Sequence, residues 1–340
     1  MTVLPAVPLS VLDLAPVVSG RTAADALEGT RELAQHVERL GFTRFWLAEH
    51  HNMPGIASSA PAVLIAAVAA ATERIRVGSG GVMLPNHPPL VVAEQFGTLS
   101  ALYPGRIDLG LGRAPGTDPL TARALRRSVE PLSDDDFPQQ LGELIGFLRG
   151  GFRPGHAFGQ IRAVPGDGVG PPIWLLGSSG YSAQLAGELG LPFAFAHHFM
   201  AHNTLPALAV YRRAFQPTDE LPEPYAMVAV QVVVADSDET AERLVLPGAL
   251  SFLQLRQNNP IPLPTVEEAA AYPWTPQERA FAAERYEQQA VGSVATVRSR
   301  LASLLTTTGA DELMVTTMVP DRRARLDSMD RLAAMFGTTG

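Results

Sequence analysis

The sequence predicts an α/β protein folded as one (β/α)₈ TIM barrel over residues 1–340. Short runs of β-branched and apolar residues alternate with longer segments of helical periodicity, and this alternation is typical of a parallel sheet covered by helices. Eight strand–helix units can be assigned in the chain, and eight units favour a closed barrel. The same pattern also fits an open, doubly wound sheet, which is the alternative.

The N-terminal part of the chain supplies the first four strands. Gly41 should end the first helix, and Pro61 stands in the first turn of the second, where its missing N–H costs nothing. Strands are expected at residues 9–15, 42–48, 75–84 and 107–111, and helices at 22–40, 61–73 and 89–102.

The alternation of strand and helix patterns then becomes irregular and later resumes. Strands are expected at residues 173–176, 193–196, 225–235 and 312–318, and helices at 182–189, 201–215 and 322–335. Two long excursions interrupt this series, at residues 114–170 and 237–290. We expect both to be insertions in the βα loops, which cover the active-site face of such barrels.

Composition excludes several classes of protein. The formal net charge is -8, and no basic face suggests a nucleic-acid partner. The chain has no cysteine, so disulfides and thiolate chemistry are absent. It also has no lysine, which excludes a Schiff base and a Walker A phosphate site. Any bound phosphate must be held by arginine, hydroxyl groups or backbone N–H groups.

Nothing in the sequence suggests export or membrane insertion. The N-terminus has no basic segment before an apolar run, and the apolar stretch at residues 60–72 is too short to span a bilayer. We therefore expect a cytoplasmic protein without a membrane partner.

Four segments, each at or near the end of an expected strand, resemble the luciferase-like monooxygenase family of flavin-dependent oxidoreductases. They read FWLAEHH at 45–51, VGSGGVMLP at 77–85, AEQF at 93–96 continuing through PGRIDLGLGR at 104–113, and LGSSGYSA at 176–183. Within the family, the chain is most similar to the group that contains an oxygenase of mensacarcin (aromatic polyketide) biosynthesis.

The resemblance implies a two-component monooxygenase. A separate NAD(P)H:flavin reductase would supply FMNH₂, and the enzyme would capture O₂ as a flavin C4a-peroxide and oxygenate an organic substrate, such as a polyketide or other secondary metabolite. It also implies a homodimer that packs helices of the second and third units. Two alternatives stay open: hydride transfer with the deazaflavin F420, and a non-catalytic flavin-binding protein. Bacterial luciferase has a reactive cysteine where this chain has Gly112, which argues against light emission.

Glu49 and His50 are the expected catalytic residues. They follow the second strand, and catalytic groups of a barrel project from strand ends. A histidine exchanges protons near neutral pH, and the resemblance places the family's active-site histidine at His50. Because neighbouring residues of a strand point in opposite directions, at most one of His50 and His51 should face the flavin. The other would cap the strand end.

The third strand carries Ser79, Gly80 and Gly81, which we expect beside the flavin ring. Glycine within a strand indicates a close approach by a ligand or by another backbone. The resemblance adds a non-proline cis peptide, expected between Ser79 and Gly80. The alternative is a bulge that shapes the barrel.

Two segments are expected to bind the phosphate of the cofactor. Arg113 follows the fourth strand, and a guanidinium matches a phosphate in a bidentate way. Small residues open the helix after the fifth strand, where backbone N–H groups favour an anion; they are Gly177, Ser178, Ser179 and Tyr181. The alternatives are a surface salt bridge for Arg113 and plain helix capping for the turn.

Four further residues are expected to line the substrate pocket: Asp13, Asp118, His197 and His198. His198 and His202 are four residues apart, a spacing that metal ligands can have. Suitably spaced carboxylate ligands are missing, so no metal is expected.

Overall fold

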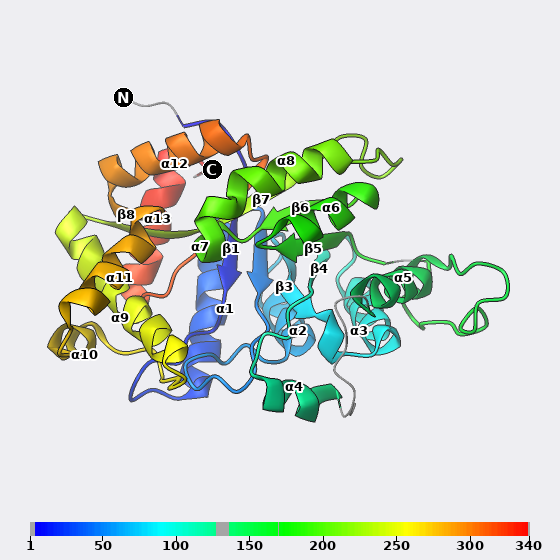
Figure 1. Cartoon of the computed structure of the whole chain (residues 1–340), viewed down its shortest axis with the longest axis horizontal. Helices are drawn as coiled ribbons and strands as arrows, with labels where there is room; N and C mark the ends of the chain where they lie inside the picture. Colours follow the sequence, from blue (N-terminus) through cyan, green and yellow to red (C-terminus); the bar gives the residue numbers. More distant parts are fainter. Residues whose placement is uncertain (1–3, 127–135, 169, 339–340) are drawn as a thin grey trace.

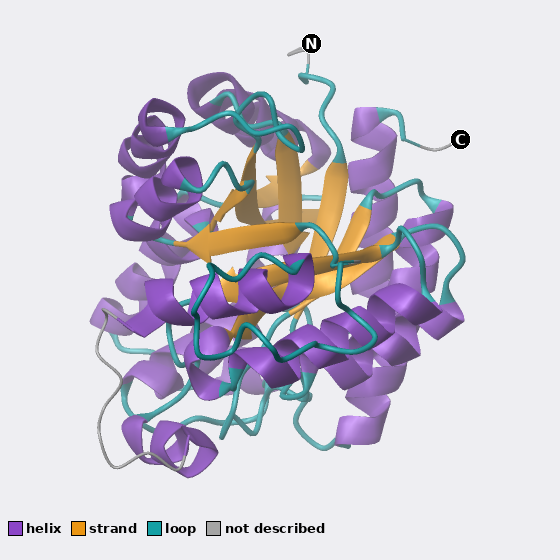
Figure 2. Ribbon diagram, turned by 90° about the vertical axis from the view of Figure 1, so that its right-hand side faces the viewer, coloured by secondary structure: helices purple, strands orange, loops and turns teal. Residues whose placement is uncertain are grey.

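The computed structural model describes residues 4–126, 136–168 and 170–338, and a sheet of nine parallel strands forms its centre. Eight strands close into a barrel, because β6 pairs with β7, β7 with β9, and β9 with β1. Figure 2 shows the strands surrounded by helices. The predicted (β/α)₈ barrel is confirmed. The strands are β1 (Leu9–Asp13), β2 (Arg44–Leu47), β3 (Arg76–Met83), β4 (Ile107–Gly112), β5 (Ile173–Gly177), β6 (Phe193–Phe195), β7 (Ala226–Ala235), β8 (Ala290–Ser293) and β9 (Glu312–Thr316).

Helices connect the strands and cover the barrel (Figure 1). No helix in the described part of the chain is both long and apolar enough to cross a membrane. The α-helices are α1 (Ala23–Arg39), α2 (Pro61–Ala71), α3 (Pro89–Leu102), α4 (Pro119–Arg126), α5 (Asp136–Arg149), α6 (Gly180–Glu188), α7 (His197–Met200), α8 (Thr204–Ala214), α9 (Asp238–Arg256), α10 (Val266–Ala271), α11 (Pro276–Glu287), α12 (Val294–Thr308) and α13 (Arg322–Phe336). Two short 3₁₀ helices are η1 (Leu84–Asn86) and η2 (Ala201–Asn203).

Side chains alternate between the helices outside the barrel and its interior, as the pleat of a strand requires. On β1, Val11 packs in the large core between strands and helices. Its neighbour Leu12 lies in a smaller interior cluster with Trp46, Trp174 and Met314. The two tryptophan rings meet edge to face, with centroids 5.2 Å apart. Large side chains therefore fill the middle of the barrel, and they form the floor of the cavity described below.

A buried ion-pair network closes the N-terminal end of the barrel. Arg44 donates to Asp108 Oδ2 at 2.9 Å and to Glu312 Oε1 at 3.0 Å. Arg76 Nε donates to the other oxygen of Asp108 at 3.0 Å, and the Tyr225 hydroxyl donates to Glu312 at 2.9 Å. Burial works to lower the pKa of Arg44, but the two carboxylates outweigh it and raise that pKa above its ordinary value. The network therefore joins β2, β3, β4 and β9 through charged groups.

The excursion at residues 237–290 contains α9, α10 and α11 and leads into a strand that the sequence did not predict. This strand, β8, pairs with the second half of β7, from Val232 to Ala235, whereas β9 pairs with the first half. It has four residues and contains Gly292, so it lacks the longer β-branched run by which the other strands were recognised.

The excursion at residues 114–170 divides into two parts. Helix α4 lies at the same end of the molecule as α10, opposite the N-terminus (Figure 1). Helix α5 then packs on α3, and the segment after it does the same, since a Cβ on Gly97 of α3 would stand 2.3 Å from Gly166 Cα. The part after α5 therefore lies against α3 and not over the active-site face as expected.

Backbone hydrogen bonds join three loops at the C-terminal end of the barrel. In the loop after β1, Val17 N–H donates to Gly55 O of the loop after β2 at 2.9 Å. The same loop pairs with the segment after α9: Ser19 N–H donates to Leu263 O, and Leu263 N–H donates to Val17 O, both at 2.8 Å. The three loops thus form one connected layer.

Candidate functional site

A cavity of about 210 Å³ opens at the C-terminal mouth of the barrel. Its floor consists of apolar side chains that project into the barrel, including Leu12, Trp46, Met227 and Met314. Its walls come from the ends of β3 to β7. Among the expected site residues, the cavity brings together Gly80, Gly81, Arg113, Gly177, Ser178, Ser179 and His198. An apolar recess with a few polar groups at its edge is the usual form of a cofactor site.

One edge of this cavity is suited to an anion. Arg113, directly after β4, lies over the ring of Tyr181, with its guanidinium carbon 4.6 Å from the ring centroid. Ser179 is the N-cap residue of α6, and its side chain makes no capping hydrogen bond. The first turn of α6 therefore presents backbone N–H groups and the positive end of the helix dipole beside a guanidinium. Tyr181 contributes through its stacking on Arg113 and does not itself line the cavity.

The serine and the two glycines of β3 have different environments. Gly80 and Gly81 line the cavity, whereas the Ser79 hydroxyl is buried and donates to Gly110 O of β4 at 2.8 Å. The non-proline cis peptide lies between Gly80 and Gly81, one residue later than expected. A bulge also interrupts the β3–β4 pairing between Ser79 and Val82. The glycines thus serve both expected purposes: an open cavity wall and close contact between strands.

We predict that a Gly81→Ala change destabilises the protein by about 1–3 kcal/mol, because overpacking forces the backbone to move. An added Cβ would stand 2.6 Å from the carbonyl oxygen of Gly110 in β4. Urea unfolding of the variant measures the effect. Gly142→Ala in α5 is the matched control, since a Cβ there meets nothing within 4 Å. Equal stability of the Gly81 variant and the wild type would contradict the prediction.

A second cavity of about 130 Å³ adjoins the first, and the side chain of Phe199 lines both. His50 lines this second cavity, and its Nδ1 lies 3.4 Å from Gly116 O. Burial lowers the pKa of His50 below its ordinary value of 6.5, so the ring is neutral at neutral pH. His51 points elsewhere: its Nε2 lies 2.8 Å from Glu49 Oε1, and it lines neither cavity.

Glu49 is fully buried and lies at the centre of a hydrogen-bond cluster. His51 Nε2 and His87 Nε2 each lie 2.8 Å from Glu49 Oε1, and Met83 N–H donates to Oε2 at 3.0 Å. Burial works to raise the pKa of Glu49, but the hydrogen bonds from His87, His51 and Met83 outweigh it and hold that pKa below its ordinary value. Glu49 therefore joins the end of β2 to the end of β3 and lines neither cavity.

The adjacent histidines of α7 have separate environments. His198 lines the first cavity, its Nδ1 lies 3.1 Å from Ala229 O, and burial lowers its pKa to about 4. His197 lies between Thr204 Oγ1 at 2.8 Å and Gln288 O at 2.9 Å and, contrary to expectation, lines neither cavity. In the described parts of the chain, no group of three or more histidine or acidic side chains could hold a metal ion.

Asp13 and Asp118 do not line either cavity. Asp13 is on the outward face of β1, where it pairs with Arg325 of α13 and accepts from the Thr30 hydroxyl of α1 at 2.6 Å. Leu12 is the neighbour that faces inward. Asp118 accepts from Thr121 N–H at 3.0 Å and so caps the start of α4. Both expectations for the substrate pocket therefore need correction.

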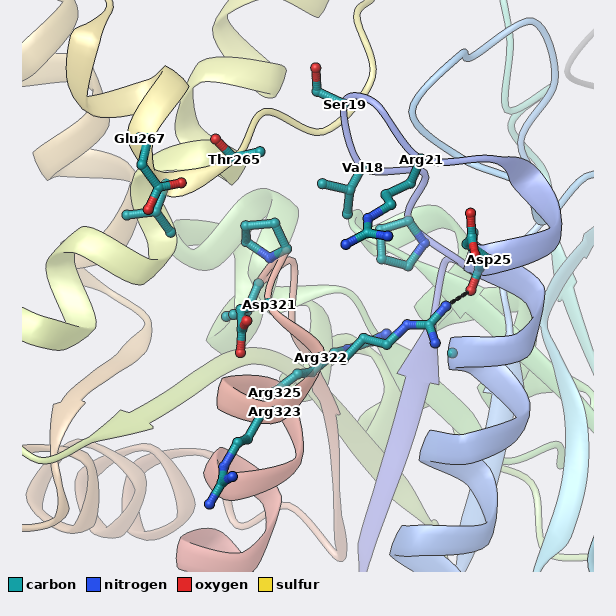
Figure 3. Close-up of a pocket in the computed structure, with 16 residues that line it drawn as sticks. Val18, Ser19, Arg21, Asp25, Thr265, Glu267, Asp321, Arg322, Arg323 and Arg325 are labelled. Atoms are coloured by element: carbon teal, nitrogen blue, oxygen red, sulfur yellow. Dashed lines mark hydrogen bonds between the residues drawn. The ribbon is translucent and has the colours of Figure 1, made fainter.

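A third cavity, of about 550 Å³, lies between the loop after β1 and the start of α13 (Figure 3). Four arginines line it, but three acidic residues line it as well, and Arg325 already pairs with Asp13. Figure 3 shows Arg322 reaching Asp25, whose backbone oxygen accepts its hydrogen bond. Because Arg325 meets the outward-facing side of β1, this cavity lies outside the barrel wall, and it shares no lining residue with the first two cavities.

Comparison with known proteins settles the family. A family model described as luciferase-like monooxygenase matches residues 8–312. The chain belongs to the luciferase-like monooxygenase family. The enzyme class predicted from the sequence, a flavin-dependent monooxygenase, is thereby confirmed together with the family resemblance.

Similar proteins extend over most of the chain. A luciferase-like monooxygenase of Escherichia coli (strain K12) is 48% identical over 321 residues, covering 94% of each chain. An N-acetyl-S-alkylcysteine monooxygenase of Bacillus subtilis (strain 168) is 41% identical over 268 residues, 78% of each chain. The crystal structure of apo-MsnO8 has a TM-score of 0.88 at 41% identity and covers 98% of this chain and 99% of its own.

More distant structures share the fold of the family and differ in cofactor. The oxygenating constituent of 3,6-diketocamphane monooxygenase from Pseudomonas putida, in complex with FMN, has a TM-score of 0.69 at 21% identity, with 97% of each chain covered. An F420-dependent secondary alcohol dehydrogenase has a TM-score of 0.66 at 14% identity and covers 99% of this chain and 100% of its own. A flavin or a deazaflavin is thus compatible with this fold.

Two residues at the mouth of this luciferase-like barrel were not expected from the sequence. Phe199 lines both cavities although its side chain is 51% exposed. Arg285, on α11, lines the second cavity beside His50. Phe199 directly follows His197 and His198, which were expected at the pocket, so its position in the sequence is a usable signal. Arg285 lies within a helix that carries no motif, and only the folding of the excursion brings it to the mouth.

Proposed function

We propose that this protein is the oxygenase component of a two-component system, which uses reduced FMN and O₂ to oxygenate a small organic substrate. One observation carries the proposal. An apolar cavity with an arginine and a helix N-terminus at its edge adjoins a second cavity that contains a neutral histidine. The first cavity suits a flavin with a phosphate, and the second suits a substrate.

The residues present fit FMN in two respects. Gly80, Gly81 and Gly112 leave one wall of the first cavity without side chains, and a flat ring needs such a wall. Arg113 and the start of α6 would hold the phosphate, because a guanidinium and backbone N–H groups both bind anions. When bound in reduced form, FMN would supply the electrons that activate O₂.

The protein's own side chains would position the substrate, exclude water and manage protons. His50 is neutral at neutral pH and lines the substrate cavity, so it can accept and return a proton there. Glu49 would act as a positioning residue, since its hydrogen bonds fix His51 and the end of β3. Apolar side chains such as Phe199, Ile56 and Met318 would keep bulk water away.

We predict that Arg113→Ala raises the dissociation constant for FMN by at least about tenfold, as expected for the loss of one charge-assisted phosphate contact. Fluorescence titration with FMN measures it. Riboflavin, which lacks the phosphate, should bind the variant and the wild type equally. Arg213→Ala, at an exposed position on α8, is the control variant. An unchanged FMN constant for the Arg113 variant would exclude the phosphate assignment.

The second cavity suggests the size of the substrate. Its volume of about 130 Å³ is small for a fused-ring polyketide, so of the substrates expected from the resemblance we favour a smaller metabolite. The Bacillus subtilis relative is named for N-acetyl-S-alkylcysteine, which makes a small S-alkylated compound a reasonable first substrate to assay.

The proposal includes two protein partners and a compartment. A flavin reductase would deliver FMNH₂ in a transient encounter in the cytoplasm. A second copy of the chain would pack on α2 and α3, where Val63 is 68% exposed and Leu102 is 62% exposed. Helix α2 is apolar on all sides, and such a helix is usually covered. Light scattering of the purified protein tests the homodimer.

The decisive test is an anaerobic titration with reduced FMN, and in parallel with reduced F420, followed by admission of O₂. Binding of reduced FMN and rapid O₂ consumption support the proposal. Binding of reduced F420 alone would replace it with hydride transfer, since a deazaflavin does not activate O₂. Binding of reduced FMN without O₂ consumption above that of free flavin would indicate a flavin-binding protein without catalytic function.

A further inference from the structure

The second cavity contains one formal positive charge. Apart from Arg285 and His50, the described residues that line it are apolar, small or, in the case of Ser251, a neutral hydroxyl. No acidic side chain lines it, and no ion pair with Arg285 occurs among the described residues. Burial lowers the pKa of His50 and of the nearby His198, so neither adds a charge at neutral pH. Arg285 is therefore a partly buried cation without an acidic partner among the described residues.

Arg285 makes two kinds of contact: its guanidinium stacks on an aromatic ring, and it forms a hydrogen bond with the neighbouring Tyr286 side chain, which only partly offsets the effect of burial on its pKa. Its central carbon lies 3.7 Å from the ring centroid of Phe252 on α9, which is a stacked cation–π contact. The N–H donors of a guanidinium point outward in its plane, so stacking does not satisfy them. Nε is buried and has no hydrogen-bond partner among the described residues.

Stacking between helices alone does not account for this arrangement. Phe252 and Phe281 stack with centroids 6.0 Å apart, and Arg256 lies over Phe281, so α9 and α11 are already joined by aromatic contacts. Burial lowers the pKa of Arg285, which reflects the cost of keeping its charge away from water. Its polar neighbour Tyr286 is neutral, because burial raises the pKa of that phenol to about 12. A buried charge is normally retained where an anion can satisfy it.

We propose that Arg285 recognises a carboxylate of the substrate, so that the enzyme acts on small organic acids with an apolar body. This inference rests on the proposed function, because it assigns the substrate class of the same site. The planar fork of the guanidinium would bind the two carboxylate oxygens side by side. The apolar part of the acid would lie among Met53, Ile56 and Leu255, and its reactive end would reach past His50 and Phe199 to the first cavity.

Straight-chain fatty acids and their amides test this directly, because each pair has nearly the same shape and differs in charge. We would measure dissociation constants by calorimetry at neutral pH for pairs from pentanoate and pentanamide to nonanoate and nonanamide, with and without FMN. The wild type should bind at least one acid about tenfold more tightly than its amide. Arg285→Met should abolish this preference, and Arg285→Lys should retain part of it.

The control is Arg279→Met, which removes an exposed arginine from the same helix and should leave the preference unchanged. Circular dichroism checks that each variant is folded. If the methionine variant does not fold, the lysine variant still tests the inference, because its preference for the acid should be reduced. A wild type without preference for the acid at any chain length would overturn the inference, as would a preference that survives in a folded methionine variant. Titration of the wild type with reduced FMN tests the proposed function separately: normal flavin binding without acid preference would overturn only the role of Arg285.

Discussion

Replacing His50 with alanine should lower the rate of substrate oxygenation by about a hundredfold or more, the usual contribution of a positioned proton acceptor or donor. The ring lines the substrate cavity, and burial lowers its pKa. The rate is measured as the oxygen-18 that is incorporated from labelled O₂ into the product, with an acid that the wild type oxygenates as the substrate. His202→Ala, at an exposed histidine, should retain the wild-type rate.

The pH profile separates this role from a merely structural one. Because the pKa of His50 lies below 6.5, the neutral ring persists at pH values where an ordinary histidine is already protonated. The wild-type rate should therefore hold as the pH falls through 6.5 and decline only at lower pH. The alanine variant should lack this decline. A variant with an unchanged rate and the same profile would remove His50 from the mechanism.

Replacing Arg44 with methionine should lower the free energy of unfolding by about 3–5 kcal/mol, the usual cost of removing one partner of a buried ion pair. Asp108 and Glu312 are both fully buried, and among the described residues the change would leave Glu312 with only the hydroxyl groups of Ser10 and Tyr225 as side-chain partners. Urea unfolding followed by circular dichroism measures the loss.

Two further variants make this result specific. Arg74→Met removes an arginine that is 72% exposed, in a loop near the same end of the barrel, and should change stability by less than about 1 kcal/mol. Arg44→Met combined with Glu312→Gln should recover part of the loss, because the glutamine carries no charge. If the Arg44 and Arg74 variants were equally stable, the network would not contribute to folding as proposed.

The sequence was most informative where a segment carries its own periodicity or capping. Helix α3 has the predicted bounds, and α1 ends at Arg39 with Leu40 as its C-cap, directly before the predicted stop at Gly41. Two elements differ most from the prediction, and neither carries a local signal of its own. Strand β8 forms on the part of β7 that extends beyond β9. Helix α7 has four residues, which is too short to show a helical period in the sequence.

The same distinction applies to the site. Gly80 lies in the second half of β3, and Arg113 and His50 follow β4 and β2. The C-terminal halves of parallel strands and the loops after them meet at one face, so these positions could be predicted. The sequence does not show which of two neighbouring residues of β1 faces the interior of the barrel. The structure places Leu12 inside, so Asp13 points outward, contrary to the prediction. Arg285 reaches the cavity through packing of α11 on α9, which no local pattern indicates.

Backbone hydrogen bonds connect the loops after β1, β2 and α9 in series from Gly55 through Val17 to Leu263, so the loop after β1 cannot move without breaking its bonds to the other two. Gly55, Ile56 and Ile261 of these loops also line the second cavity. Access to that cavity should therefore depend on one cooperative opening, in which the amide protons of Val17, Ser19 and Leu263 exchange with solvent at a common rate. Substrate entry and product exit would then share a single gating equilibrium.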